Sequence, residues 1–360
     1  MKNYPLQPRR YALPSLAAVL LTICYTPVFA ESAGENLPKS VELVSACFPQ
    51  FGASAYYDLG QQTDVALHRS GLVVEFHKEG LGAALWYRLG QIHGSGVTWG
   101  GNRVAGMNGH YPAVAISKEG YVIVVYSSRN SQTDCQLYYR VGKLDPAGDQ
   151  TQSITWLTDI IHWDAGFRNS IAINDSGAIV SVHETHGSSN SLYYRVGRLK
   201  NPAGGEYTVQ WDSAPWGINY DTGTSPHIAI NNHNQVVEVH QVPGEWLLHY
   251  RRGNLVGGTI QWGDSRRYDS HATNPGVALL DSGLVLEIHA SNGLFSRTGT
   301  LSLSNGQDID WAAPHAIDSR PVVKEPALAS NGSSAVQTHH ALVGTAHREE
   351  LYFSVSDICD

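Results

Sequence analysis

Glutamate and histidine side chains recur two residues apart in this sequence, a spacing that could support acid–base or hydrogen-bonding chemistry. The pairs are Glu75/His77, Glu238/His240 and Glu287/His289. In related segments Ser181 precedes His183, and Val124 precedes Tyr126. Residues two apart on a β-strand share a face. Each pair is therefore expected to present a carboxylate and an imidazole to the same neighbour.

Each pair lies in a repeated segment. The copies are "VALHRSGLVVEFH" (65–77), "VAISKEGYVIVVY" (114–126), "IAINDSGAIVSVH" (171–183), "IAINNHNQVVEVH" (228–240), "VALLDSGLVLEIH" (277–289) and "PALASNGSSAVQTHH" (326–340). Their turn positions, Gly71, Gly120, Gly177, Asn234, Gly283 and Gly332, are 49, 57, 57, 49 and 49 residues apart. A period near 50 is typical of stacked supersecondary units such as propeller blades.

An aromatic strand such as "LYYRVG" (137–142) follows each copy, and a short strand such as "ITW" (154–156) follows the first five. An aromatic–Asp pair or its remnant, expected to form an outward turn, follows four of the copies. Alternating β-branched residues with two-residue hairpin signals favour an all-β array. The sequence therefore predicts an all-β, six-bladed β-propeller built from four-stranded repeats of about 50 residues.

Closure of the ring needs a strand from outside the repeats, because five "x-W" strands serve six copies. The segment "SVELVSA" (40–46) is expected to supply this N-terminal strand to the last blade. Closure would bring Cys47 and Cys359 into one blade, where we predict a disulfide; three separate thiols are the alternative. Cys135 lies before an aromatic strand and is expected to be the free thiol.

The N-terminus has the layout of an export signal. Lys2, Arg9 and Arg10 precede the apolar run "YALPSLAAVLLTIC", and small residues precede Glu31. This layout predicts a signal peptide over residues 1–30, a linker over 31–39 and a single propeller domain over 40–360. The protein is expected to be secreted or periplasmic.

Composition restricts the class of partner. Cleavage after Ala30 would leave 21 basic and 32 acidic residues, a net charge near −11. Nucleic acid is not an expected partner, because its binding needs clustered Lys and Arg. The apolar run is too short, and too interrupted by Pro14, to predict membrane insertion. The sequence leaves the oligomeric state open.

Two interpretations of the repeated polar residues remain open. They could satisfy hydrogen bonds between neighbouring blades, because buried polar groups need partners. Alternatively, each blade junction could present a polar and aromatic pocket to the same small ligand. The candidate ligand-binding residues are Glu75, His77, His183, Glu238, His240, Glu287 and His289, together with Asp164, Asp221 and Asp269 of the aromatic–Asp pairs.

The sequence contains no recognisable catalytic or cofactor motif. It has no Gly-x-Ser-x-Gly elbow, no His-Glu-x-x-His and no phosphate-binding glycine loop. His183 with His186, and His339 with His340 and His347, are imidazole groups that chance can explain among 17 histidines. We predict no catalytic residue, no metal site and no cofactor. A propeller enzyme gathers non-equivalent residues at one channel end, and no such set is visible in the sequence.

From about residue 55 to 356, the pattern "VALxxxGxVVEVH … LYYRVG … IxWG … YD" resembles a blade repeat of secreted bacterial proteins. Its layout is similar to that of the lectin-type propellers. That resemblance implies repeated carbohydrate pockets, and hence a lectin-like protein that binds a glycan or cell-surface component. A protein-interaction scaffold is the first alternative. A propeller hydrolase or lyase acting on polysaccharide or a small ester is the second.

Overall fold

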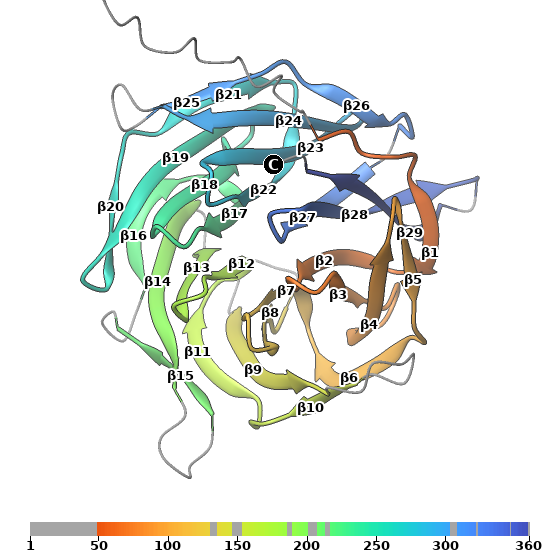
Figure 1. The fold of residues 1–360 in the computed structure, drawn as a ribbon, viewed down its shortest axis with the longest axis horizontal. Coiled ribbons are helices and arrows are strands. Elements are labelled where there is room, and N and C mark those ends of the chain that lie inside the picture. The colour runs from red at the N-terminus through yellow and green to blue at the C-terminus, as the bar shows by residue number, and fades with distance from the viewer. Residues whose placement is uncertain are drawn as a thin grey trace, which may run out of the picture. The chain divides into compact units, whose positions relative to one another are not determined.

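The computed structural model describes residues 49–129, 135–145, 153–185, 189–200, 207–212, 217–302, 308–321, 323–345 and 347–358. These residues belong to the compact unit Cys47–Asp360. They form six antiparallel sheets arranged around a central axis (Figure 1). The predicted six-bladed β-propeller is confirmed.

The first three blades follow one another along the chain. The first contains β2 (Gln61–Leu67), β3 (Leu72–Lys78), β4 (Ala84–His93), β5 (Gly96–Trp99) and β6 (Arg103–Asn108). The second contains β7 (His110–Ile116), β8 (Tyr121–Ser127), β9 (Gln136–Leu144), β10 (Ile154–Trp156) and β11 (Ile161–Ala165). The third contains β12 (Phe167–Ile173), β13 (Ala178–Glu184), β14 (Ser191–Lys200), β15 (Thr208–Trp211) and β16 (Ile218–Thr222).

The last three blades repeat this order until the ring closes. The fourth contains β17 (Thr224–Ile230), β18 (Gln235–Gln241), β19 (Leu247–Val256), β20 (Thr259–Trp262) and β21 (Arg266–Ser270). The fifth contains β22 (Thr273–Leu279), β23 (Leu284–Ser291), β24 (Gly293–Leu301), β25 (Ile309–Trp311) and β26 (His315–Asp318). The sixth contains β27 (Val323–Ser330), β28 (Ser334–Val343), β29 (Arg348–Asp357) and β1 (Ala55–Leu59).

Each of the first five blades carries one strand more than the sequence predicts. The long third strand pairs with two short strands, so that β4 pairs β6 along its first half and β5 along its second half. The short strands β11, β16, β21 and β26 carry the aromatic–Asp pairs or their remnant. The expectation that these pairs form turns was wrong, because the third strand is long enough to pair both segments.

A strand from the N-terminal side of the repeats closes the ring, as predicted, but it is the segment that was expected to form the turn into the first copy. Strand β1, which carries Tyr57 and Asp58, pairs with β29 of the last blade. Residues 40–46, Cys47 and Cys359 lie outside the described residues, so the predicted strand and disulfide stay predictions. Cys135 is a buried free thiol, whose sulfur donates a hydrogen bond to the Arg129 carbonyl oxygen at 3.3 Å.

The inner hairpin of every blade turns at one left-handed residue. The turn positions Gly71, Gly120, Gly177, Asn234, Gly283 and Gly332 have φ between 59° and 94°. Glycine adopts this region without a Cβ clash, and asparagine tolerates it better than most residues. The turns that set the repeat in the sequence are therefore the turns of the structure.

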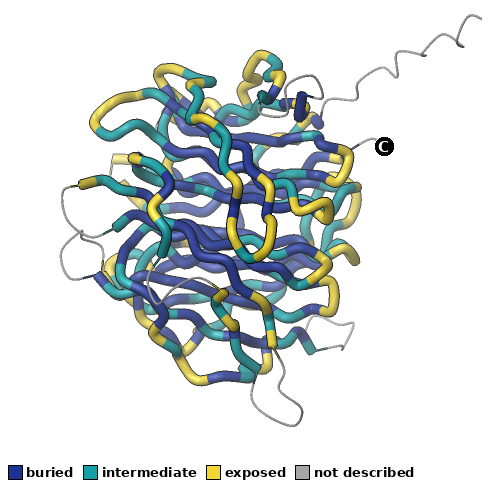
Figure 2. Tube along the Cα trace, turned by 90° about the vertical axis from the view of Figure 1, so that its left-hand side faces the viewer, coloured by how far each residue is buried: buried dark blue, intermediate teal, exposed yellow. Residues whose placement is uncertain are grey.

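Aromatic stacks join neighbouring blades. The ring of Tyr220 on β16 stacks on that of Trp262 on β20 at 5.0 Å, and similar pairs join three other junctions. Strands are buried over most of their length, whereas exposed residues gather in the connecting loops (Figure 2). No helix in the described ranges is long and apolar enough to cross a membrane.

In each of the first five blades, a glycine on the long third strand packs against the tryptophan ring of the adjacent short strand. A Cβ added at Gly253 would come within 2.6 Å of the Ile260 Cγ2 methyl and 3.0 Å of the Trp262 ring. The last glycine of the "LYYRVG" segment is therefore required by the close approach of an indole ring.

Gly253→Ala is expected to lower the free energy of unfolding by about 1–3 kcal/mol, because it overpacks this contact. Gly101→Ala is the control, because a Cβ there meets nothing within 4 Å. Urea unfolding of both variants measures the difference. Equal stabilities of the two variants would contradict the packing explanation.

Candidate functional site

The Glu-x-His pair of the first blade belongs to a polar chain that crosses between blades. Glu75 accepts a hydrogen bond from the Tyr57 hydroxyl at 3.0 Å, and its Oε2 lies 3.0 Å from His77 Nδ1. Asp58 Oδ2 lies 4.0 Å from His77 Nε2 and 2.8 Å from Arg88 Nε. Tyr57 and Asp58 lie on β1, whereas the other three residues lie on β3 and β4. The chain therefore links the last blade to the first.

Two more junctions contain the same five residue types. They are Tyr220, Asp221, Glu238, His240 and Arg251 at one junction, and Tyr268, Asp269, Glu287, His289 and Arg297 at the other. His240 Nδ1 lies 3.0 Å from Glu238 Oε2, and Arg251 Nε lies 2.5 Å from Asp221. At these three junctions an arginine of the long third strand, Arg88, Arg251 or Arg297, thus pairs with the Asp of an aromatic–Asp strand.

At the other three junctions, different residues stand in place of some of these five polar residues. His183 faces Asp164 at 4.0 Å, but Ser181 stands in the place of the glutamate. His339 lies 3.0 Å from the Gln337 amide oxygen. Val124 and Tyr126 make the junction between the first two blades apolar. His339 and His340 are adjacent on one strand, so their side chains point to opposite faces.

The glutamate determines the direction in which the pKa of each histidine shifts. Burial lowers the pKa of His77, His240 and His289, but the adjacent glutamate and the facing aspartate together outweigh burial and raise it overall. Without a glutamate, burial lowers the pKa of His183 to about 4 and also lowers that of His339. The Glu-x-His pair therefore favours protonated histidine between the blades.

The predicted ligand-binding residues are mostly buried. Glu75, Glu238 and Glu287 are 0% exposed, and the histidines at these junctions are at most 3% exposed. Asp164, Asp221 and Asp269 face these histidines and the repeated arginines. The structure accounts for these residues as inter-blade hydrogen-bond partners. Their ligand-binding role stays a prediction.

One blade junction is hollow. A pocket of about 570 Å³ lies where the last blade meets the first, lined by Asp58, His77, Trp86 and Asn102 among others. The Trp86 indole nitrogen and the Asn102 side-chain oxygen are buried there without a hydrogen-bond partner. This junction is the place where the predicted inter-blade site has room for a ligand.

Glu238→Gln should destabilise the protein more at pH 5 than at pH 8. The pKa of His240 is raised in the fold, so its stabilising effect is complete below about pH 6.5 and is lost as the pH rises through the folded pKa. Asp221 and Arg251 also face His240 and are unchanged. Breaking a buried ion pair typically costs about 3–5 kcal/mol.

Urea unfolding at the two pH values measures this effect, with the exposed Glu245→Gln as control. Equal losses at pH 5 and pH 8 would show that Glu238 does not favour protonated His240.

A second group of residues gathers at one end of the central channel. Each inner strand begins with a β-bulge that holds one non-glycine residue at φ between 46° and 55°. These residues are Gln62, Tyr111, Arg168, Ser225, Asn274 and Glu325, one from each blade. The left-handed region disfavours residues with a Cβ. The surrounding fold therefore enforces this conformation six times.

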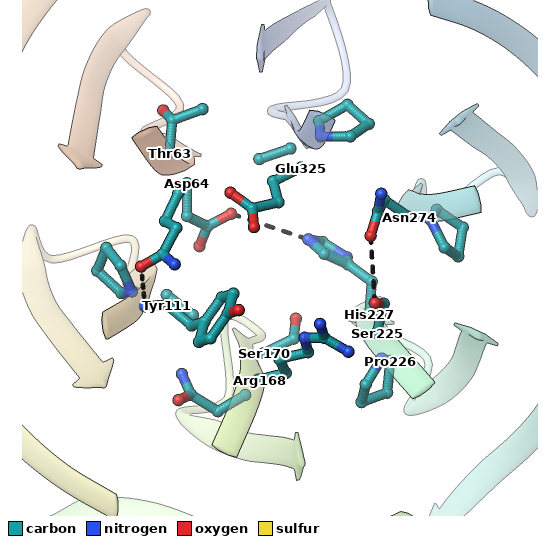
Figure 3. A pocket seen from close by; sticks show the side chains of 17 residues that line it. Thr63, Asp64, Tyr111, Arg168, Ser170, Ser225, Pro226, His227, Asn274 and Glu325 are labelled. Carbon is teal, nitrogen blue, oxygen red and sulfur yellow. Dashed lines mark hydrogen bonds and ion pairs between the residues drawn. The ribbon is translucent and has the colours of Figure 1, made fainter. Parts of the chain in front are cut away.

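The six residues and their neighbours line an open pocket of about 90 Å³ (Figure 3). Asp64 and His227 come from opposite blades of the ring and meet there, with 3.8 Å between Asp64 Oδ1 and His227 Nε2. The Val114 amide donates to Asp64 Oδ2 at 2.7 Å, and the Val277 amide donates to His227 Nδ1 at 3.3 Å. The next inner strand thus anchors each side chain.

A second layer of non-equivalent residues supports the pocket. The residue after the repeated histidine position is Lys78, Ser127, Glu184, Gln241, Ala290 or His340 in successive blades. Glu184 accepts hydrogen bonds from Arg168 at 3.4 Å and from the Ser225 amide at 2.6 Å. His340 Nδ1 lies 3.3 Å from Glu325 Oε2. Arg168 and Glu325 of the pocket thus contact ionisable side chains of the adjacent strands, Glu184 and His340.

The pocket is one of three along the channel. A middle pocket of about 130 Å³, also lined by Asp64 and His227, continues between the inner strands. A pocket of about 440 Å³ at the opposite mouth is lined by the inner hairpin turns. The Asp64–His227 pair lines both the first and the middle pocket, and so lies where the two meet.

Sequence reasoning missed this set of residues. The set lies in the tripeptides "QTD", "YPA", "RNS", "SPH", "NPG" and "EPA", directly before the repeated apolar segments. One sequence feature could have indicated these residues. The first position of the tripeptide holds a different residue in every repeat, and in four of the six it is followed by proline. The sequence prediction used the positions at which the six repeats share a residue type, whereas the channel residues lie at positions where the repeats differ.

The described part of the chain contains no group of three His, Cys, Asp or Glu side chains arranged to hold a metal ion. The pocket instead offers two carboxylates, a guanidinium, an imidazole and several amide or hydroxyl groups. Such a set can bind a polar organic ligand through directional hydrogen bonds.

Comparison with known proteins supports the fold. No protein-family model matches the chain, and no curated protein matches it by sequence. A protein of unknown function from Dyadobacter fermentans has a TM-score of 0.60 at 10% identity, over 86% of this chain and 99% of its own. An α-L-arabinanase of Penicillium chrysogenum, in complex with arabinobiose, has a TM-score of 0.53 at 12% identity, over 86% of this chain and 99% of its own.

A fungal alcohol oxidase in complex with copper also has a TM-score of 0.53, at 9% identity, over 86% of this chain and 76% of its own. At these identities the likeness shows the propeller fold alone. Proteins with different activities share this fold equally, so function has to be argued from the site.

Asn274→Val is expected to destabilise the protein by about 1–2 kcal/mol, because a β-branched residue is strongly disfavoured at a left-handed φ. Asn274→Gly should not, because glycine adopts this region freely. Thr273→Val, one residue earlier in the same strand, is the control. Thermal unfolding distinguishes the three variants. A loss for Thr273→Val as large as for Asn274→Val would contradict the enforced conformation.

Proposed function

We propose that this protein is an exported propeller that binds a carbohydrate at the Asp64–His227 mouth of its channel. The observation that carries the proposal is the gap between these two side chains. At 3.8 Å, Asp64 Oδ1 and His227 Nε2 are too far apart for a direct hydrogen bond. Each is nevertheless fixed by a backbone amide and directed into the pocket (Figure 3).

The two atoms have complementary hydrogen-bonding roles. His227 Nδ1 accepts a hydrogen bond from the Val277 amide, so the ring proton of a neutral His227 is on Nε2, which can donate. Asp64 Oδ1 can only accept when ionised. A hydroxyl group both donates and accepts, so one sugar hydroxyl above the gap satisfies both atoms.

The rest of the pocket suits a polyhydroxylated ring. Gln62, Ser225 and Asn274 add amide and hydroxyl groups, and the Tyr111 ring with four prolines adds apolar surface for C–H groups. A volume of about 90 Å³ has space for several water molecules, which the hydroxyls of a sugar can replace. The arabinanase fold shared with this chain, seen with arabinobiose, supports a carbohydrate ligand.

Export is part of the proposal. The signal-peptide pattern of residues 1–30 supports a secreted or periplasmic location, where glycans and cell-surface components are accessible.

The test is calorimetric titration of the exported chain with arabinobiose, galactose and glucose. Asp64→Asn and His227→Phe are expected to weaken binding at least about tenfold, because each removes one partner of the bridging hydroxyl. Trp86→Ala, in the inter-blade pocket, is the matched control and should bind normally.

Loss of binding in Trp86→Ala alone would move the site to the blade junction predicted from the sequence. Absence of binding to all three sugars would overturn the proposal.

Glycoside hydrolysis is a second candidate, favoured by the presence of two carboxylates, Asp64 and Glu325, in one pocket. Release of reducing ends from a bound oligosaccharide, abolished in Glu325→Gln, distinguishes hydrolysis from binding alone.

A further inference from the structure

The mouth pocket carries more negative than positive charge. Asp64 and Glu325 both face its centre (Figure 3), and Arg168 is the one cationic side chain among its lining residues apart from His227. His227 Nδ1 accepts a hydrogen bond from the Val277 amide, which leaves its Nε2 to face Asp64. Two carboxylates therefore face a single guanidinium.

The positive charge of Arg168 already has a partner inside the protein. Glu184 is 0% exposed and lies 3.4 Å from Arg168 Nη1. The Thr224 hydroxyl donates to the same Glu184 oxygen at 2.7 Å, and the Ser225 amide does so at 2.6 Å. Burial raises the pKa of Glu184, and Arg168 with these two donors opposes that shift.

The other basic groups near the pocket are also engaged. The Lys78 ammonium is held by the carbonyl oxygens of Glu79 and Gly80, at 2.8 and 2.7 Å. Burial lowers the pKa of Lys78, and its acidic neighbours Glu349, the pocket residue Glu325 and Glu79 oppose that shift. His340 lies behind Glu325 and is 2% exposed, so a ligand in the pocket meets the carboxylate first.

We infer that this pocket accepts neutral or amino sugars and excludes acidic sugars. The inference rests on the proposed function and specifies its ligand class. A sugar carboxylate would lie close to Asp64 and Glu325, and such like-charge contact is unfavourable in a partly desolvated site. An ammonium group in the same position would find two carboxylate partners.

The experiment compares sugars that differ at one substituent. Galactose, galactosamine and galacturonate form one series, and glucose, glucosamine and glucuronate form another. Titration of the exported chain at neutral pH should show the acidic member of a series binding at least about tenfold more weakly than the neutral member. This discrimination should decrease at high salt, because ions screen repulsion at an open pocket.

Glu184→Gln tests the cause of the selectivity without touching the ligand. The variant leaves the charge of Arg168 unmatched, so the affinity for galacturonate or glucuronate should rise relative to that for the neutral sugar of the same series. Glu325→Gln removes a pocket carboxylate and should shift selectivity in the same direction if Glu184→Gln does not fold.

The outcomes separate the two claims. Acidic sugars that bind as tightly as neutral ones would overturn the charge selectivity and leave carbohydrate binding in place. Selectivity unchanged in both variants would also overturn it. Absence of binding by every sugar would overturn the proposed function and this inference with it.

Discussion

Closing six sheets into a ring buries both faces of every blade, so each polar group on a blade face has to find its partner in the next blade. The Tyr–Glu–His–Asp–Arg chain meets this constraint at three junctions. Its glutamate makes three contacts that hold it in place at the first junction, from Tyr57, Thr63 and His77. Buried polar groups without such partners are strongly destabilising. When a blade is duplicated, the five polar residues are therefore retained together.

The same closure gives the channel mouth its form. Each inner strand has one edge that no strand of its own blade covers, and a β-bulge at its start turns one side chain toward the axis. Asp64, Ser170 and His227 use this edge by accepting hydrogen bonds from the amides of the following inner strand. A symmetric scaffold thus holds an asymmetric set of side chains, which is the arrangement that specific recognition of one ligand needs.

Sequence periodicity predicted the parts of the structure that repeat. Blade number, hairpin turns at Gly71 and its equivalents, and closure by an N-terminal strand all follow from spacing and turn chemistry. The aromatic–Asp segments were misplaced in turns because periodicity does not reveal that one long strand can pair with two short strands. The channel site escaped prediction because its residues share a backbone position and no residue type.

The Glu-x-His pairs show the limit of reading chemistry from recurrence. Their spacing left a structural and a ligand-binding interpretation open, and the structure surrounds them with protein partners and leaves a sizeable pocket beside His77 at the first junction. Asp64 and His227, which occur once each at their repeat position, face each other across the channel mouth at 3.8 Å, too far apart for a direct hydrogen bond. In a duplicated fold, departures from the repeat are therefore the better guide to a single binding site.

The most direct test of this account is a crystal structure of the protein soaked with the neutral sugar that binds most tightly. The account predicts a sugar ring at the channel mouth, with one hydroxyl within hydrogen-bond distance of both Asp64 Oδ1 and His227 Nε2. A sugar bound only in the inter-blade pocket beside Trp86, with the channel mouth holding solvent, would contradict it.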